Sequence, residues 1–215
     1  MKLRAFLQET SPGPDDEFQK KFRKFLKKEP YIGKHGWWNS TQTCIEHLEK
    51  TNHTVIVLSN GTIKIPGDLN LIDLKLTSIA VKFSHVEGRM KLQGNQFANF
   101  EWASNLVVDD SLDLGNNRFT SLRGIEKHIK NIRRGLNLRG NKITESILGL
   151  MLTRIRDIDV GHSWGADDGQ VLSVEAEKAF NILKKHRLPT VIDMDRVIDV
   201  QHELIEEGLE EFAKI

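Results

Sequence analysis

The sequence is poor in cysteine and in long apolar runs. Its single cysteine, Cys44, cannot form an internal disulfide or build a cysteine-based zinc site. No apolar run approaches the ~20 residues that a transmembrane helix needs. The N-terminal residues turn acidic and lack the apolar core of a signal peptide. We therefore expect a cytoplasmic protein that does not enter a membrane.

The chain also lacks an excess of either charge. Lysine and arginine number 31 and aspartate and glutamate 30, so the net charge is +1. No bulk electrostatic argument therefore favours nucleic acid or an acidic substrate. With 39% hydrophobic and 28% charged residues over 215 positions, the composition is that of a globular protein. The length allows one medium domain or a smaller domain with appendages.

One short motif returns along the middle of the chain. LDLGNNRFTSL (112–122) aligns with LNLIDLKLTSI (69–79), MKLQGNQFANF (90–100) and LNLRGNKITES (136–146), and a degenerate fifth copy starts at Ile158. Successive copies start 21 to 24 residues apart. That spacing lies within the range of about 20–29 residues that is typical of leucine-rich repeats. The pattern predicts a solenoid.

The repeat carries an asparagine inside its apolar pattern. Asn95, Asn117 and Asn141 hold this position, while Leu74 and Ser163 replace it in the first and last copies. A sharp turn after each strand leaves backbone groups unpaired inside the coil, and an amide side chain can both donate to and accept from them. We therefore predict a structural role for these asparagines. Two apolar columns agree with the alignment: Leu76, Phe97, Phe119 and Ile143, and Ile65, Val86, Val108 and Ile132.

The residues before the repeats predict a helical leader. Phe18, Phe22, Phe25 and Leu26 lie at helical spacing. The opposite face is basic, with Lys20, Lys21, Arg23, Lys24, Lys27 and Lys28. Residues 41–50 predict a short helix, and the Asn60–Gly61 pair predicts the turn of a β-hairpin that leads into the first repeat.

The residues after the repeats predict two amphipathic helices. The first begins at Ser173 and carries lysines at its end, before Pro189. The second covers residues 193–215, with a candidate interruption at Gly208. These helices are expected to close the exposed end of the solenoid.

Two segments carry a family resemblance. LSNGTIKIPGDLNLIDLKLTSIAVKFSHVEGRMKL, at 58–92, and the tail VIDVQHELIEEGLEEFAKI, at 197–215, resemble phage-encoded leucine-rich-repeat-like proteins. The resemblance implies the fold and a phage origin. The group has no established activity, so it implies no site residues, and the N-terminal 50 residues do not match its pattern.

Taken together, the sequence predicts an α/β repeat fold. We expect a short leucine-rich-repeat-like solenoid of about five coils, with a helical leader and a two-helix C-terminal cap. The expected domains are the leader at 1–52, the solenoid with its N-terminal hairpin at 53–165, and the cap at 166–215.

The expected function is a non-enzymatic protein-binding module that acts on a host protein, such as a defence or regulatory protein. Solenoids commonly bind through the strand face. The candidate contact residues there are Asp68, Asn70, Arg89, Lys91, Asp113, Asn137, Arg139 and Asp159, with Trp37 and Trp38 added from the leader. No catalytic residue, metal ligand or cofactor is predicted, and the oligomeric state stays open.

Three alternatives remain open from the residues alone. The first alternative is a component of the phage particle. The second is an enzyme that uses the loop at His162, and the third is a nucleic-acid binder that uses the basic helix at 18–28. None of the eight histidines forms a helical zinc pair. The glycines near the strands lack the strand–loop–helix arrangement that holds phosphate.

Overall fold

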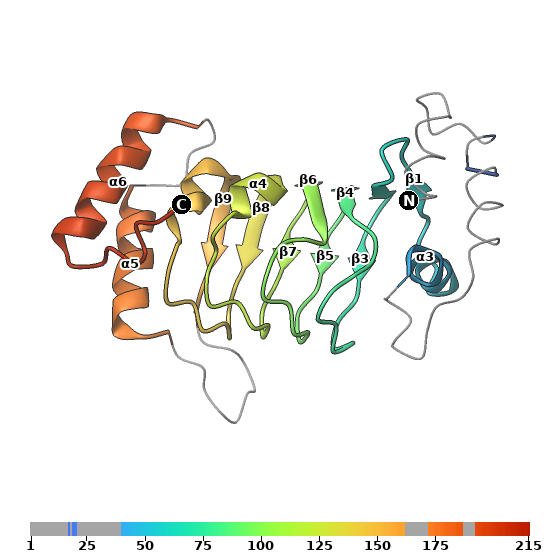
Figure 1. The fold of residues 1–215 in the computed structure, drawn as a ribbon, viewed down its shortest axis with the longest axis horizontal. Coiled ribbons are helices and arrows are strands. Elements are labelled where there is room, and N and C mark those ends of the chain that lie inside the picture. The colour runs from blue at the N-terminus through green and yellow to red at the C-terminus, as the bar shows by residue number, and fades with distance from the viewer. Residues whose placement is uncertain (1–16, 18, 21–39, 162–171, 187–191) are drawn as a thin grey trace.

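The computed structural model describes residues 17, 19–20, 40–161, 172–186 and 192–215. Trp37, Trp38, His162 and the basic residues at 21–28 therefore lie outside the described residues. Figure 1 shows strands stacked along the long axis of the molecule, with α3 (Thr41–Lys50) toward the N-terminal end and α5 (Val174–Lys185) and α6 (Met194–Glu206) at the C-terminal end.

The middle of the chain is a β-solenoid of about four turns. One parallel ladder stacks β2 (Ile63–Ile65), β4 (Phe83–Val86), β6 (Ala103–Val108), β8 (Ile129–Asn137) and β9 (Arg154–Asp159). A second ladder stacks β3 (Leu69–Asn70), β5 (Met90–Lys91) and β7 (Leu112–Asp113) on the C-terminal halves of β8 and β9. The solenoid is thus confirmed, with about four turns where the repeat predicts about five coils.

The strand register confirms the alignment of the repeats. Leu69, Met90, Leu112, Leu136 and Ile158 pair in succession across the second ladder. All five are buried. Because side chains alternate along a strand, these residues point inward and their neighbours point outward.

The repeat asparagines are buried and form a cross-turn ladder of hydrogen bonds. Asn117 donates its amide hydrogens to the carbonyls of Leu92 (3.0 Å) and Leu114 (3.0 Å), which belong to successive turns. Its Oδ1 accepts from the Phe97 amide at 3.0 Å. Asn95 and Asn141 repeat this arrangement one turn on either side. The predicted structural role is confirmed.

A second column of the repeat adopts left-handed backbone conformation. Its φ values are 56° at Asp73, 69° at Gly94, 51° at Asn116 and 68° at Gly140. Glycine, asparagine and aspartate tolerate this region best. The turns stack so closely here that a Cβ on Gly94 would lie 1.7 Å from Asp73 Oδ1. Glycine is therefore required in this turn by both conformation and space.

The N-terminal end carries the predicted hairpin and helix. β1 (Ile56–Val57) pairs antiparallel with β2 around the Asn60–Gly61 turn. Helix α3 (Thr41–Lys50) buries Cys44, Ile45 and Leu48 in the solenoid core. Burial raises the pKa of the Cys44 thiol to about 11.

Gln19 of the leader lies against β1, the edge strand of this end. Its amide donates to the Val57 carbonyl (2.6 Å), and its oxygen accepts from the Val57 amide (3.2 Å). An unpaired strand edge is open to association with other chains. The Gln19 side chain therefore satisfies two edge groups in the way that a neighbouring strand would.

The C-terminal end carries helices α5 (Val174–Lys185) and α6 (Met194–Glu206). The second helix ends at Glu206, just before the predicted interruption at Gly208, whose φ is 72°. The following tail folds back, and the amides of Ser146 and Ile147 donate to the carbonyls of Glu211 and Phe212. Two short helices, α4 (Ile125–His128) and the 3-10 helix η2 (Leu148–Leu152), were not predicted from the sequence.

Candidate functional site

The predicted contact residues of the strand face do form a continuous column. Asn70, Lys91, Asp113, Asn137 and Asp159 pair in succession along the second ladder. Neighbouring strands in a sheet lie about 4.8 Å apart, so these side chains are evenly spaced on one surface. The structure thus brings together residues that are 21 or more positions apart in the sequence.

Four members of this column are engaged in the fold itself. The Oδ1 atoms of Asn70, Asp113, Asn137 and Asp159 each accept the amide of the residue two positions later, at 2.9 to 3.4 Å. Such Asx turns fix the bend that follows each strand. The polar column therefore has a structural role at each turn, in addition to the surface it presents.

The last two turns are also linked to each other. Arg139 forms an ion pair with Asp159 at 2.6 Å, and Asn137 donates to Asp113 Oδ1 at 2.9 Å. Burial alone would raise the pKa of Asp159, but the bonds from Arg139 and from the Gly161 amide lower it on balance. Asp159 is therefore held as a carboxylate at neutral pH.

The corner between the two ladders carries alternating charges. Asp68 Oδ1 accepts the Arg89 amide at 2.8 Å. Asp110 lies 3.8 Å from Arg89 and 3.5 Å from Arg134, and Asp109 lies 3.3 Å from Arg133. The arginine side chains in these pairs are exposed. Exposed ion pairs of this kind stabilise a fold by only ~0–1 kcal/mol.

Exposed apolar side chains gather at the other end of the molecule. Of the large apolar residues that are exposed in the described ranges, only Leu74 lies in the solenoid. The others belong to the C-terminal helices and the residues beside them: Val174, Ile192, Met194, Ile198, Ile205 and Ile215. Contiguous apolar patches on a protein surface commonly mark interaction sites.

Helix α6 carries the most continuous part of this surface. Its inner side buries Val197, Val200 and Leu204. Met194, Ile198 and Ile205 follow at spacings of four and seven residues, which places them along one exposed stripe. Their side chains are 54%, 44% and 45% exposed, respectively. We call these three residues the α6 stripe.

A row of carboxylates lies beside the α6 stripe. Asp195, Asp199 and Glu206 occupy the next helical positions around α6, and all three are exposed. No ion pair within the described residues involves any of them. Residues 192–215 contain eight acidic residues and two basic ones. We call Asp195, Asp199 and Glu206 the acidic row.

The joint between α5 and α6 uses other charges. Glu203 accepts from Lys185 (2.7 Å) and His186 (2.7 Å), and Lys178 pairs with Glu207 at 2.6 Å. The hydrogen bond from Lys185, followed by that from His186, lowers the pKa of Glu203. These pairs fix α6 on α5 and leave the α6 stripe facing away from the joint.

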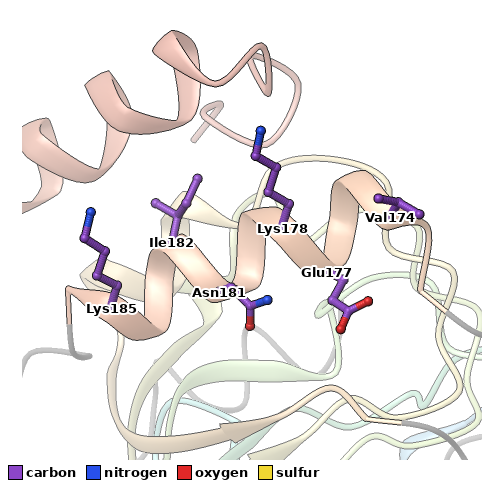
Figure 2. A pocket seen from close by; sticks show the side chains of 6 residues that line it. All are labelled: Val174, Glu177, Lys178, Asn181, Ile182 and Lys185. Atoms are coloured by element: carbon purple, nitrogen blue, oxygen red, sulfur yellow. The ribbon is translucent and has the colours of Figure 1, made fainter.

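A groove of about 450 Å³ runs along α5. Figure 2 shows Val174, Lys178, Ile182 and Lys185 along one side of the helix, with Glu177 and Asn181 on another side. Since Lys178 and Lys185 are held by ion pairs with α6, the groove lies beside the joint. The residues that line the groove include no nucleophile beside a base and no cluster of acidic side chains.

The sequence-predicted sites fall into two groups. The strand-face residues are brought together as expected, whereas Trp37, Trp38, the His162 loop and residues 21–28 lie outside the described residues. Within the described part of the chain, no group of three or more histidines, cysteines or carboxylates could hold a metal ion. In the same part, no helix is both long and apolar enough to cross a membrane.

Sequence reasoning missed the α6 surface. The signal is the width of the apolar arc on α6: six apolar residues, of which only three are needed to pack the helix on the fold. Comparisons with protein-family models, with curated proteins and with solved structures found no match for this chain.

Proposed function

We propose that this protein is a non-enzymatic protein-binding module. The observation that carries the proposal is the gathering of exposed apolar side chains at the C-terminal helices, on a fold whose other apolar residues are almost all buried. Because these Ile and Met side chains are about half exposed, burial of each by a partner would contribute roughly half of the ~1.5–3 kcal/mol that complete burial from full exposure gives.

The solenoid supplies a rigid support for such a surface. Its turns are fixed by the asparagine ladder and by the Asx turns, and its core continues into α5 and α6. A surface held on a rigid framework loses little conformational freedom when a partner binds. This favours binding over a lid or a mobile loop as the task of the C-terminal end.

We further infer the identity of the repeat and its biological setting. The repeat period and the asparagine position support the leucine-rich-repeat class, and the packing of the tail on the last turn supports a cap role for α5 and α6. The resemblance of segments 59–92 and 197–215 to phage proteins supports a phage origin. We therefore propose that the partner is a host protein, either a defence or a regulatory protein, in the cytoplasm.

Affinity capture from a bacterial lysate tests the proposal. The full chain serves as bait beside two variants, Ile198→Ser with Ile205→Ser, and Arg89→Glu with Lys91→Glu. Bound proteins are identified by mass spectrometry and their stoichiometry is measured. We expect a stoichiometric host protein that the strand-face variant retains and the α6 variant loses.

Two results would oppose this proposal. A partner lost only with the strand-face variant would move the binding site to the ladder. Recovery of the chain in purified phage particles, without any stoichiometric host protein, would make it a particle component instead. Circular dichroism on each bait confirms that the substitutions leave the fold intact.

A further inference from the structure

We propose that the α6 stripe and the acidic row together dock a basic amphipathic helix of the partner protein. This inference rests on the proposed function and names the chemistry of its partner. It concerns one side of one helix, where the α6 stripe and the acidic row lie next to each other and the exposed His202 separates their first and last turns.

The dimensions of the α6 stripe fit one helix lying along another. Met194 and Ile205 are 11 positions apart, which corresponds to ~16 Å along the helix axis, or about three turns. A partner helix of similar length can place apolar residues at spacings of three and four positions against Met194, Ile198 and Ile205. The spacing of the apolar residues in the α6 stripe thus matches the spacing of the apolar residues on an amphipathic partner helix.

The acidic row defines the charge of the partner. Glu203 and Glu207 of α6 are neutralised by α5, but Asp195, Asp199 and Glu206 have no cation within the described residues. A docked helix would take these carboxylates partly out of water. Lysine or arginine beside the apolar side of the partner would compensate them, because opposite charges across an interface favour the correct pairing.

The same charges disfavour the other occupants of an apolar face. Anionic lipid and nucleic-acid phosphate would be repelled by the acidic row. A second copy that paired α6 with α6 in an antiparallel arrangement about a two-fold axis would bring the two acidic rows to the same side of the interface, since such an interface uses the same patch twice. A basic helix is the occupant that both halves of the surface attract.

The test uses a labelled Lys–Leu peptide of about 18 residues, which is long enough to form an amphipathic helix. A scrambled peptide of the same composition and a glutamate-for-lysine analogue serve as controls. Binding to the full chain is measured by fluorescence anisotropy at low and high salt. We expect the amphipathic peptide to bind, the scrambled peptide to bind at least tenfold more weakly, and the acidic analogue not to bind.

Two variants divide the surface into its parts. Met194→Ser with Ile198→Ser should weaken peptide binding about tenfold at all salt concentrations, because buried apolar area is lost. Asp195→Asn with Asp199→Asn and Glu206→Gln should weaken it by a similar factor at low salt and less at high salt. The matched controls are Leu74→Ser, an exposed apolar residue of the solenoid, and the triple change Glu87→Gln, Glu101→Gln and Glu145→Gln, also in the solenoid, which should stay within twofold.

The inference fails if the scrambled peptide binds equally well, or if the α6 variants bind the peptide like the unchanged chain. It also fails if sedimentation shows a dimer that the α6 variants dissociate, since the occupant would then be a second copy. A lysate partner that is lost with Ile198→Ser and Ile205→Ser, while the peptide does not bind, would leave the proposed function standing and reject the basic helix.

Discussion

The solenoid and the C-terminal helices use their side chains in different ways. In the solenoid, the apolar columns are buried, the asparagines bond to successive turns, and most of the polar strand column closes Asx turns. In α6, three apolar residues and three carboxylates remain exposed without partners in the described part of the chain. Regular repeats thus leave few side chains for recognition, and the less regular end retains them.

The same difference separates the residues that stabilise the fold from the residues that we expect to bind a partner. Substitutions in the repeat columns remove cross-turn bonds and should change the free energy of unfolding. Substitutions on the exposed side of α6 alter side chains that are about half exposed, so they should change the free energy of unfolding little and association more strongly. The following predictions address the contrast, starting with the largest expected effect.

Asn117→Ala should have the largest effect on stability. The change leaves the carbonyls of Leu92 and Leu114 and the amide of Phe97 without their buried partner. Each such group costs ~1–3 kcal/mol, so we expect a loss of about 3–5 kcal/mol in urea unfolding. Asn181→Ala on the exposed side of α5 is the control and should change stability by less than ~0.5 kcal/mol. Similar losses in both variants would remove the distinction between the two regions.

The pair Gly94→Ala and Gly208→Ala separates the cost of a left-handed backbone conformation from the cost of close stacking between turns. Both glycines have positive φ, so either alanine costs ~1 kcal/mol or more. At Gly94 the new Cβ would also meet Asp73 of the neighbouring turn, whereas at Gly208 there is nothing within 4 Å. We therefore expect Gly94→Ala to be more destabilising by about 1–3 kcal/mol in urea unfolding. Equal losses would mean that the turns do not stack as closely as the solenoid requires.

Acidification should weaken the joint between α5 and α6. The folded pKa of Glu203 is lowered, chiefly by the hydrogen bond from Lys185. A group of this kind contributes stability above its unfolded pKa and loses it as the pH falls through its folded value. The decline in stability between about pH 5 and about pH 3 should therefore be shallower in Glu203→Gln than in the unchanged chain. Thermal unfolding across this range measures the effect, with Glu101→Gln as the control. An unchanged slope in Glu203→Gln would show that the joint does not depend on this carboxylate.

Exposed substitutions should have the smallest effect on stability. Arg89→Glu with Lys91→Glu in the solenoid and Ile198→Ser in α6 should each shift the unfolding free energy by no more than ~0.5–1 kcal/mol. Only the α6 variant should change partner binding. A large loss of stability in Ile198→Ser would show that this residue packs in the fold and is not part of a free surface.

Much of the solenoid could be predicted from its sequence because the repeat fixes several columns at once. The sequence pattern locates the repeat starts at Leu69, Met90, Leu112 and Leu136 together with the asparagine position, and the register confirms these starts. The hairpin at Asn60–Gly61 and helix α3 also follow from local signals. These features depend on residues close together in the chain or on a pattern that repeats.

Other features depend on contacts that no local pattern shows. The short helices α4 and η2 each occur in one turn only, and the spacing of the repeat does not predict them. The return of the tail, whose carbonyls accept from the amides of Ser146 and Ile147, joins residues about 65 positions apart and has no local signal. The α6 stripe was missed because a sequence pattern identifies apolar positions but not which of them stay exposed after packing.

Hydrogen–deuterium exchange on the chain bound to its captured partner tests the central claim most directly. The account predicts slower exchange on binding along Met194–Glu206 and no change in the strands β5 and β7 of the solenoid. Slower exchange in β5 and β7 with none in α6 would contradict it. That result would place the binding surface on the strand face of the solenoid.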